Sequence, residues 1–337
     1  MRKIIVALKR KNVNNAGTKA KNDIEYFLAK DGFEKLDIDL NDIDCLDFVH
    51  SSLDNSESKM IVVQYGGVAL PIIKKILRCI KKIPNSKVIL ILHDVESLRS
   101  FKSNKFSFLE KIKSKLEINI FNSVDILIVH NEVMKKKLLL IGVKSRMESI
   151  EIFDYFNSNI VLPRENVKNN KICFAGELSK SKFLLDFNTK KYELDLFGPN
   201  PAEKYGEGVS YLGEYKSSEL PEHLNQSYGL VWDGTSLETC EGFVGKYLMY
   251  NNPHKTSLYL SCGLPVIIWD QAAIAKFVDK YNLGFTIGTL NNLDKFMSTI
   301  TDDEYFKIKK NCMEMSYKIR EGFFIRDAVV RSIKRLQ

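Results

Sequence analysis

The sequence predicts an α/β protein made of two Rossmann-like halves, each a doubly wound parallel sheet. Three observations support this fold class. Apolar segments of strand length alternate with segments of helical periodicity along the whole chain. The strand segments show little polar alternation, which is typical of strands buried on both faces of a parallel sheet. The alternation lapses once, over residues 154–170, and then starts again.

The first half contains four strand segments and four helical segments. The strands are predicted from short runs rich in Ile, Val and Leu, at residues 3–8, 59–64, 87–92 and 124–129. The helices are predicted from apolar residues at helical spacing with a Gly, a Pro or a fresh strand after each, at residues 16–30, 68–82, 105–121 and 132–140. These units predict a first domain over residues 1–153, followed by a polar linker over residues 154–170 that contains Pro163.

A second alternating series predicts a second domain over residues 171–337. Its strands are predicted at residues 171–175, 192–197, 228–232, 265–269 and 284–287, and its helices at residues 254–262, 272–280 and 302–320. The last helix, at residues 322–337, either packs back on the first domain or ends the second, and the sequence leaves both open. Ligands of doubly wound sheets bind beyond the carboxyl ends of the strands, so a cleft between two facing domains is the expected site.

Composition and cysteine spacing exclude several classes of protein. A chain of 337 residues with 45% hydrophobic and 27% charged residues is globular, not disordered or fibrous. The six cysteines stand singly, without the spacing of a zinc site, and predict reduced thiols in a cytosolic protein. The first apolar run is too short for the core of a signal peptide, and no run approaches the length of a membrane-spanning helix.

The net charge of +8 is concentrated in the first half of the chain. Residues 1–150 carry 27 basic and 18 acidic side chains, whereas residues 151–337 carry 23 and 24. The lysine clusters of the first half lie on predicted helices, where a solvated face is the usual explanation, and no nucleic-acid-binding motif accompanies them. Nucleic-acid binding is therefore not expected. A basic face against an anionic membrane is a candidate use of this charge.

Two polar groups follow predicted strands of the first half. A turn that includes Ala16 and Gly17 opens a helix whose free amides can hold a phosphate, and an ordinary strand-to-helix turn explains it equally well. Later, a very apolar strand ends abruptly at His93 and Asp94. Such groups are costly to bury without partners, and a carboxylate there can act as a general base toward a hydroxyl group. The alternative is that Asp94 caps the next segment and His93 is a packing residue.

The second half carries a denser group of polar residues. Lys180 follows a strand through small residues that let a ligand approach, and its side chain can reach a phosphate. Glu214 and Tyr215 offer backbone and an aromatic ring, as a nucleobase contact requires. The acids Asp233 and Glu238 can bind sugar hydroxyl groups, although acids in loops are more often only solvated. One helix start combines the amides, hydroxyl groups and cation that bind an anion, and comprises Pro253, His254, Lys255, Thr256, Ser257 and Leu258.

Several segments resemble the bacterial β-1,6-galactofuranosyltransferases of O-antigen assembly. The likeness is strongest in Trp232-Asp233-Gly234, Glu238-Thr239-Cys240, Asn251-Asn252-Pro253-His254-Lys255-Thr256-Ser257-Leu258-Tyr259-Leu260-Ser261 and Pro265-Val266-Ile267-Ile268-Trp269-Asp270. It extends more weakly to Gly17, to His93-Asp94 and to Gly322-Phe323-Phe324, and so covers essentially the whole chain. The chain is similar, more distantly, to the glucosyltransferases that extend O-linked GlcNAc on streptococcal serine-rich adhesins.

The resemblance implies a GT-B fold, a nucleotide-sugar donor held mainly by the C-terminal domain, no required metal or other cofactor, and inversion at the anomeric carbon. By position, it implies nucleotide contacts at Ala16, Gly17, Lys180, Glu214, Tyr215 and the stretch from Pro253 to Leu258. Asp94 is then the expected base, with His93, Glu96 or an acid of the second domain as alternatives. Lys255, together with Lys180, is the expected clamp on the departing UDP.

The expected function is that of a cytosolic hexosyltransferase that moves galactofuranose from UDP-galactofuranose to a surface polysaccharide on a lipid carrier, with peripheral contact to the inner face of the membrane. UDP-glucose or another UDP-hexose is the rival donor. A catalytically silent subunit that binds a nucleotide sugar or a glycan is the rival from another class, which the polar helix start and the His93-Asp94 pair disfavour. The acceptor sugar, the linkage and the oligomeric state, including a homo-oligomer, stay open.

Overall fold

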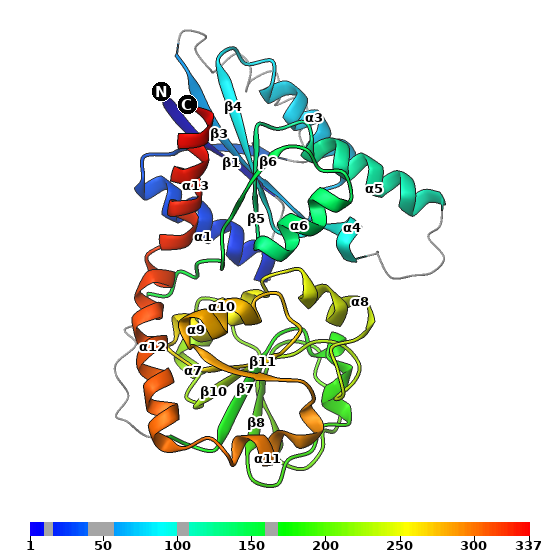
Figure 1. Cartoon of the computed structure of the whole chain (residues 1–337), viewed down its shortest axis with the longest axis vertical. Helices are drawn as coiled ribbons and strands as arrows, with labels where there is room; N and C mark the ends of the chain where they lie inside the picture. The colour runs from blue at the N-terminus through cyan, green and yellow to red at the C-terminus, as the bar shows by residue number, and fades with distance from the viewer. Residues whose placement is uncertain (10–15, 40–56, 100–107, 159–167) are drawn as a thin grey trace. The chain divides into compact units, whose positions relative to one another are not determined.

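The computed structural model describes residues 1–9, 16–39, 57–99, 108–158 and 168–337, and the chain divides into two α/β units (Figure 1). The first unit comprises Met1–Glu151 and Gly322–Gln337, and the second comprises Ile152–Glu321. Each unit contains one six-stranded sheet whose paired strands all run parallel. The predicted α/β class with two Rossmann-like halves is confirmed. Within the described ranges, no helix has both the length and the apolar character needed to cross a membrane.

The sheet of the first unit has the strand order β2-β1-β3-β4-β5-β6. Its strands are β1 (Arg2–Lys9), β2 (Glu34–Asp39), β3 (Lys59–Tyr65), β4 (Ser86–Leu92), β5 (Ile126–Val129) and β6 (Arg146–Ser149). The four predicted strands are confirmed, with small shifts at their ends. The edge strands β2 and β6 were missed because their sequences, EKLDID and RMES, carry too many polar residues to resemble a strand buried on both faces.

The helices of the first unit are α1 (Ala16–Lys30), α3 (Leu70–Ile80), α4 (Glu96–Arg99), α5 (Phe108–Phe121), α6 (Glu132–Leu140) and α13 (Phe323–Leu336). The bounds of α1 and α6 agree with the prediction. α3 begins two residues later than predicted because Ala69 is its N-cap and a proline stands in its first turn. α4 was not predicted, and the expected first residues of α5, 105–107, lie outside the described residues.

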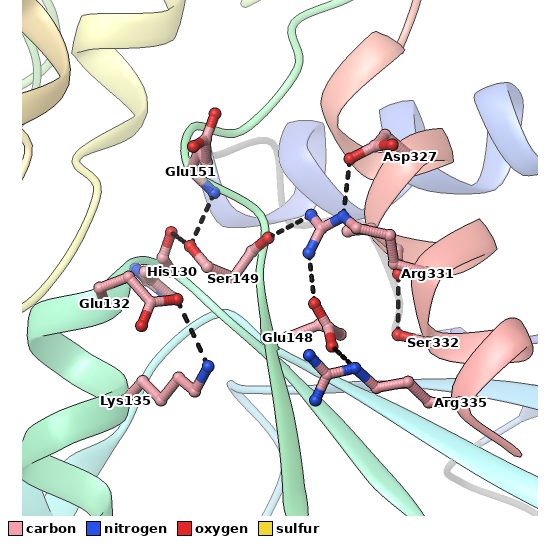
Figure 2. Close-up of polar contacts among 11 residues, drawn as sticks. His130, Glu132, Lys135, Glu148, Ser149, Glu151, Asp327, Arg331, Ser332 and Arg335 are labelled. Atoms are coloured by element: carbon pink, nitrogen blue, oxygen red, sulfur yellow. Dashed lines mark hydrogen bonds and ion pairs between the residues drawn. The ribbon is translucent and has the colours of Figure 1, made fainter. Parts of the chain in front are cut away.

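The last helix, α13, belongs to the first unit, where it packs against α1, β4, β5 and β6. Figure 2 shows Arg331 and Arg335 of α13 bound to the carboxylate of Glu148 on β6. Arg331 also donates to the carbonyl oxygen of Ser149 at 2.8 Å and pairs with Asp327 at 2.8 Å. The Glu148 side chain is only 5% exposed, so the two arginines compensate a charge that would be costly to bury alone.

Gly322 joins α12 (Asp302–Arg320) to α13. Its φ of +72° lies in the left-handed region, and a Cβ there would come within 2.3 Å of the Phe27 ring on α1. Both constraints require glycine. Arg326, in the next turn, pairs with Asp31 at 2.5 Å, just after the end of α1, so the start of α13 is fixed on α1.

The sheet of the second unit has the strand order β12-β11-β10-β7-β8-β9. Its strands are β7 (Lys171–Ala175), β8 (Glu193–Phe197), β9 (Val209–Gly213), β10 (Tyr228–Val231), β11 (Val266–Trp269) and β12 (Gly284–Ile287). Counted from β7, this is the classical dinucleotide-binding order, with a change of direction between β7 and β10. The edge strand β9 was not predicted, because it is largely exposed and short of the apolar pattern of a central strand.

The helices of the second unit are α7 (Leu220–His223), α8 (Gly242–Gly245), α9 (His254–Ser261), α10 (Ala275–Tyr281), α11 (Leu293–Met297) and α12, with 3₁₀ turns η1 (Leu178–Lys180), η2 (Lys182–Leu185), η3 (Lys246–Met249) and η4 (Leu290–Asn292). The predicted helices α9 and α12 are confirmed. α10 begins three residues later than expected, because residues 272–274 form a turn.

Residues 154–158, the described start of the predicted linker, pack within the second unit. Asp154, Tyr155 and Asn157 are buried. The backbone N–H of Tyr155 donates to the carbonyl oxygen of Ile319 at 3.2 Å, and Arg320 Nε donates to that of Asn157 at 2.9 Å. The two segments at which the chain enters and leaves the second unit are therefore bonded to each other. Residues 159–167, including Pro163, lie outside the described residues.

We expect Glu148→Gln to lower the free energy of unfolding by about 2–4 kcal/mol, because a neutral amide cannot compensate the positive charges of the two arginines of α13. Chemical denaturation followed by circular dichroism measures this change. Asp327→Asn is the matched control: its ion pair with Arg331 is exposed, and its removal costs less than about 1 kcal/mol. Equal effects of the two substitutions would contradict the role assigned to Glu148.

Candidate functional site

Lys255, in the first turn of α9, lies where the strand order of the second sheet changes direction. In open α/β sheets, ligands bind at such a point, beyond the carboxyl ends of the strands. Lys255 Nζ donates to the carbonyl oxygen of Trp232 at 3.1 Å and to Asp233 Oδ1 at 2.9 Å, both directly after β10. It also lies 4.2 Å from the ring centroid of Phe174 in β7. A cation that is only 12% exposed is thus held between the ends of β7 and β10.

Tyr259 fixes α9 against this part of the sheet. Its hydroxyl oxygen accepts the backbone N–H of Ala175, at the end of β7, at 2.7 Å. Its ring covers Gly229 of β10, where a Cβ would come within 2.3 Å of the ring carbons. Position 229 therefore has to be glycine for α9 to approach the strand this closely. The position of Lys255 follows from this packing.

The start of α9 offers hydrogen-bonding groups that the protein itself does not use. Its N-cap, Pro253, makes no side-chain cap, so no side chain at that position satisfies the first amides of the helix. The hydroxyl groups of Thr256 and Ser257 and Oδ1 of Asn251 are buried and have no hydrogen-bond partner among the described residues. These hydroxyl groups, the N-terminal end of the helix and the ammonium group of Lys255 form a set that can bind an anion.

Two other residues of this helix start contribute to packing. The ring of His254 lies 5.1 Å from that of Tyr155 and 6.3 Å from that of Phe153, centroid to centroid. The side chain of Leu258 is buried in the core. That these two residues contact a ligand stays a prediction.

The loop after β7 places Lys180 at the surface. Glu177 accepts hydrogen bonds from Asn200 Nδ2 at 2.9 Å and from Ser179 Oγ at 2.7 Å, and these bonds lower the pKa of its carboxyl group. Gly198 lets the loops after β7 and β8 meet, since a Cβ there would overlap the backbone of the β7 loop. Lys180 is exposed in η1, close enough to Glu177 for its charge to stabilise the carboxylate.

The loop after β10 is ordered by hydrogen bonds to its own backbone and to the segment after β12. Trp232 Nε1 donates to the carbonyl oxygen of Ser236 at 2.9 Å. Gly234, at φ +113°, lies against the backbone of Glu241, where a Cβ would come within 2.3 Å of the carbonyl oxygen. The exposed carboxylate of Glu238 accepts a hydrogen bond from Asn291. The two acids predicted for this loop thus have different partners: Asp233 pairs with Lys255, and Glu238 accepts a hydrogen bond that links the loop to the segment after β12.

Tyr215 and Glu214 follow the edge strand β9. The ring of Tyr215 stacks on that of His223 in α7, with centroids 3.6 Å apart and an angle of 19° between the planes. One face of the ring is therefore covered by the protein, and any stacking ligand is restricted to the other face. Glu214 is exposed.

In the first unit, Asp94 and His93 directly follow β4. Asp94 Oδ1 pairs with Arg99 Nη2 of α4 at 2.6 Å, and Arg99 Nη1 pairs with Glu96 at 3.2 Å. The Asp94 side chain is half-buried, and this partial burial raises its pKa above the ordinary value, while the Arg99 charge opposes the rise. His93 is buried, and its Nε2 lies 2.8 Å from Oε1 of Gln64. This contact is compatible with the packing alternative, and a catalytic role of His93 stays a prediction. The partner of Asp94 is a cation.

Glu117 of α5 organises this turn, and the sequence did not single it out. Its side chain is buried and accepts three hydrogen bonds, from the Tyr65 hydroxyl at 2.7 Å, the backbone N–H of Glu96 at 2.9 Å and that of Ser97 at 2.8 Å. These amides form the start of α4, so Glu117 caps α4 from another helix. The sequence feature that could have indicated this role is that Glu117 is an acid on the same helix face as the buried Ile120 and Phe121.

The neighbouring strand ends complete this edge of the first sheet. His130 follows β5, and burial lowers its pKa to about 3, so its ring is neutral at pH 7. Lys21 of α1 donates to the carbonyl oxygen of Gly66, after β3, and its charge also lowers the pKa of Asp94. Ala16 opens α1, and Gly17 is exposed in its first turn. Two cations, Lys21 and Arg99, thus act on the Asp94 carboxylate.

A metal site was not predicted, and the described residues contain no group of three or more His, Cys, Asp or Glu side chains that could hold a metal ion. Cys79, Cys173, Cys240, Cys262 and Cys312 are free thiols, and Cys45 lies outside the described residues.

Comparison with known proteins gives the same relationship from both halves of the chain. Models of the glucosyltransferase 3-like family match residues 2–152 with its N-terminal domain and residues 172–332 with its C-terminal domain. The β-1,6-galactofuranosyltransferase WbbI of Escherichia coli (strain K12) is 34% identical over 255 residues, which cover 74% of this chain and 72% of that protein. Glucosyltransferase 3 of Streptococcus gordonii is 27% identical over 254 residues, covering 75% and 72%. The resemblance carried by the sequence motifs is confirmed.

Among solved structures, the sucrose-phosphate synthase from Thermosynechococcus elongatus superposes with a TM-score of 0.63, covering 99% of each chain. The sequences are 11% identical, so this likeness concerns the fold alone.

We expect Asp94 to titrate above the ordinary range of an aspartate, because its burial outweighs the attraction of Arg99. Arg99→Met should raise the pKa of Asp94 further, and Glu96→Gln should lower it, since one removes an opposite charge and the other a like charge. Carbon-detected NMR of the side-chain carboxyl group, assigned with Asp94→Asn, measures both shifts. Shifts in the same direction would show that the ion-pair geometry described for Asp94 is wrong.

Proposed function

The chain belongs to the glucosyltransferase 3-like family and is a glycosyltransferase of GT-B fold, and from this premise we propose that it transfers galactofuranose from UDP-galactofuranose, with inversion, to a surface polysaccharide intermediate. The observation that carries the proposal is Lys255 at the switch point of the second sheet, beside the buried hydroxyl groups of Thr256 and Ser257, which have no hydrogen-bond partner among the described residues. The galactofuranosyl donor is favoured by the 34% identical relative, whose name gives that activity.

In this proposal the second unit binds the donor through its diphosphate. The start of α9 and the ammonium group of Lys255 neutralise the phosphates, and the hydroxyl groups of Thr256 and Ser257 donate to them. When Lys255 turns toward the diphosphate, its ion pair with Asp233 breaks. The Asp233 carboxylate can then accept a hydrogen bond from a hydroxyl group of the sugar. Glu238 and the exposed Lys180 lie on loops of the same sheet edge and serve the sugar and the phosphates, respectively.

The remaining predicted contacts concern the nucleotide. We assign the face of Tyr215 that points away from His223 and the backbone at Glu214 to the nucleobase, and Ala16 and Gly17 at the start of α1 to a further phosphate or ribose contact. His254 and Leu258 hold the helix start in place through their packing. Lysine side chains and helix amides compensate the diphosphate charge, so the proposal includes neither a metal ion nor another cofactor.

Inversion by single displacement needs a base at the acceptor hydroxyl and stabilisation of the departing UDP. We assign Asp94 as the base: burial raises its pKa, which makes its carboxylate a stronger proton acceptor than an ordinary aspartate. His93 and Glu117 fix the turn that carries it. Lys255, aided by Lys180, stabilises the negative charge that develops on the leaving UDP.

The acceptor in this proposal is a glycan on a lipid carrier, reached from the cytoplasmic face of the membrane. The excess of basic residues in the first half of the chain supports contact with an anionic surface. UDP-glucose is the second candidate donor, because the Streptococcus gordonii relative is named a glucosyltransferase. A silent nucleotide-sugar-binding subunit is the remaining alternative, and measured turnover would exclude it.

We expect the double variant Lys255→Met, Asp233→Asn to bind UDP about 10-fold to 100-fold more weakly than the wild type, because charge-assisted hydrogen bonds to the phosphates are lost. The double variant removes both charges of the pair and so avoids an isolated buried carboxylate. Isothermal titration calorimetry with UDP measures the affinity. The matched control is Lys246→Met, which removes an exposed lysine of the same unit and should leave the affinity unchanged. Unaltered UDP binding by the double variant would remove Lys255 from the donor site.

The proposed reaction is tested with a donor panel and a lipid-linked acceptor mimic. Released UDP should appear with UDP-galactofuranose and not with UDP-galactopyranose, UDP-glucose or UDP-GlcNAc. Asp94→Asn should lower turnover by about 10²–10⁴-fold with UDP affinity intact, since only the base is lost. Turnover with UDP-glucose alone would establish the second candidate. Full turnover of Asp94→Asn would exclude Asp94 as the base.

A further inference from the structure

The outward face of α5 carries large apolar side chains together with lysines. Phe108 is 77% exposed, Leu109 is 66% exposed and Ile112 is 40% exposed. The other exposed residues of α5 are Lys111, Lys113, Lys115 and Asn119. The acid of the first turn, Glu110, is half-buried, and none of the exposed side chains of this helix is acidic.

The opposite face of α5 is anchored in the first unit. Ile120 and Phe121 are buried in its core, and Glu117 holds the start of α4 through two backbone amides. Because the buried face is fixed, the outward side chains stand on a rigid support. Figure 1 shows the N-terminal half of α5 at the periphery of the first unit, away from the strands of its sheet.

We propose that this face of α5, defined by Phe108, Leu109, Ile112 and the three lysines, docks on an anionic lipid surface. Apolar side chains insert at the boundary between headgroups and acyl chains, and lysines at their margin pair with anionic headgroups. A helix of 14 residues with three exposed lysines lies on a bilayer and does not span it. A second copy of the chain fits less well, because its own lysines would repel these.

The position of the face in the fold connects it with the acceptor, and here the inference rests on the proposed function. α5 follows α4, which directly follows Asp94 at the carboxyl edge of the first sheet. A helix between two parallel strands runs back against their direction, so its N-terminal end is at the carboxyl edge. Phe108 therefore stands on the side of the first unit that carries Asp94, where a lipid-linked glycan would have to arrive.

The test is flotation of the full-length protein with phosphatidylcholine vesicles, with and without phosphatidylglycerol, at low and at high salt. Wild-type protein should bind only the anionic vesicles. Part of the bound protein should stay bound at high salt, because the apolar side chains hold it. Combined Phe108→Ser, Leu109→Ser and Ile112→Ser should lower the partition coefficient more than about tenfold and remove the binding that persists at high salt. Combined Lys111→Gln, Lys113→Gln and Lys115→Gln should lower it about fivefold per lysine at low salt and little at high salt.

Two control variants match these changes elsewhere on the chain. Leu139→Ser with Leu140→Ser removes apolar side chains that are 53% and 81% exposed at the far end of α6. Lys190→Gln, Lys191→Gln and Lys204→Gln remove three exposed lysines from the second unit. Both controls should bind vesicles like the wild type. Losses equal to those of the α5 variants would overturn the inference, because binding would then reflect general charge or apolarity.

Two further outcomes also overturn it: no binding of the wild-type protein to anionic vesicles, or a change of oligomeric state in the α5 variants with vesicle binding unaltered. Transfer to a water-soluble fragment of the acceptor separates this inference from the proposed function. That transfer should be unchanged in the α5 variants, while transfer to the vesicle-borne acceptor falls. If the wild type binds vesicles but turns over no donor, the proposed function is wrong, and the inference that α5 binds an anionic lipid surface is still supported.

Discussion

The packing of the Tyr259 ring against the backbone at Gly229 is the contact on which the candidate donor site depends. No side chain at position 229 leaves room for the ring, and the hydroxyl group of Tyr259 takes up the N–H of Ala175 at the end of β7. α9 is thereby held across two strands whose ends flank the switch point. The packing of α9 therefore places Lys255 and the buried hydroxyl groups of Thr256 and Ser257 at the switch point.

In the first unit, buried carboxylates position the elements around the candidate site. Glu117 binds two amides of α4 and so shapes the turn that carries Asp94 and Arg99. Glu148 binds two arginines and so adds α13 to the edge of the sheet (Figure 2). Each carboxylate is satisfied by several donors, as burial demands, and each fixes an element that apolar packing alone would leave free to shift. Of the two, Glu117 sets the geometry around Asp94, and Glu148 holds the helix that closes the unit.

The central strands and the start of α9 were predictable because their signals are local: apolar runs, a proline and a cluster of polar residues in one helical turn. The partners of Lys255 were not, since Asp233 and Phe174 meet it only through the order of the strands. The edge strand β9 lacks the apolar pattern of a central strand because its side chains are largely exposed. The capping role of Glu117 joins residues far apart in the chain, and no periodicity encodes such a contact.

The return of α13 to the first unit has a consequence for biosynthesis. The second unit is continuous in sequence, whereas the first unit consists of Met1–Glu151 and of Gly322–Gln337, which follows the second unit. During translation, the negative charge of Glu148 on β6 therefore has no ion-pair partner from α13 until Arg331 and Arg335 have left the ribosome. The usual order, in which an N-terminal domain completes its fold before the next domain is made, is therefore not open to this first unit. A premature stop before α13 would leave the second unit whole and the first without its closing helix.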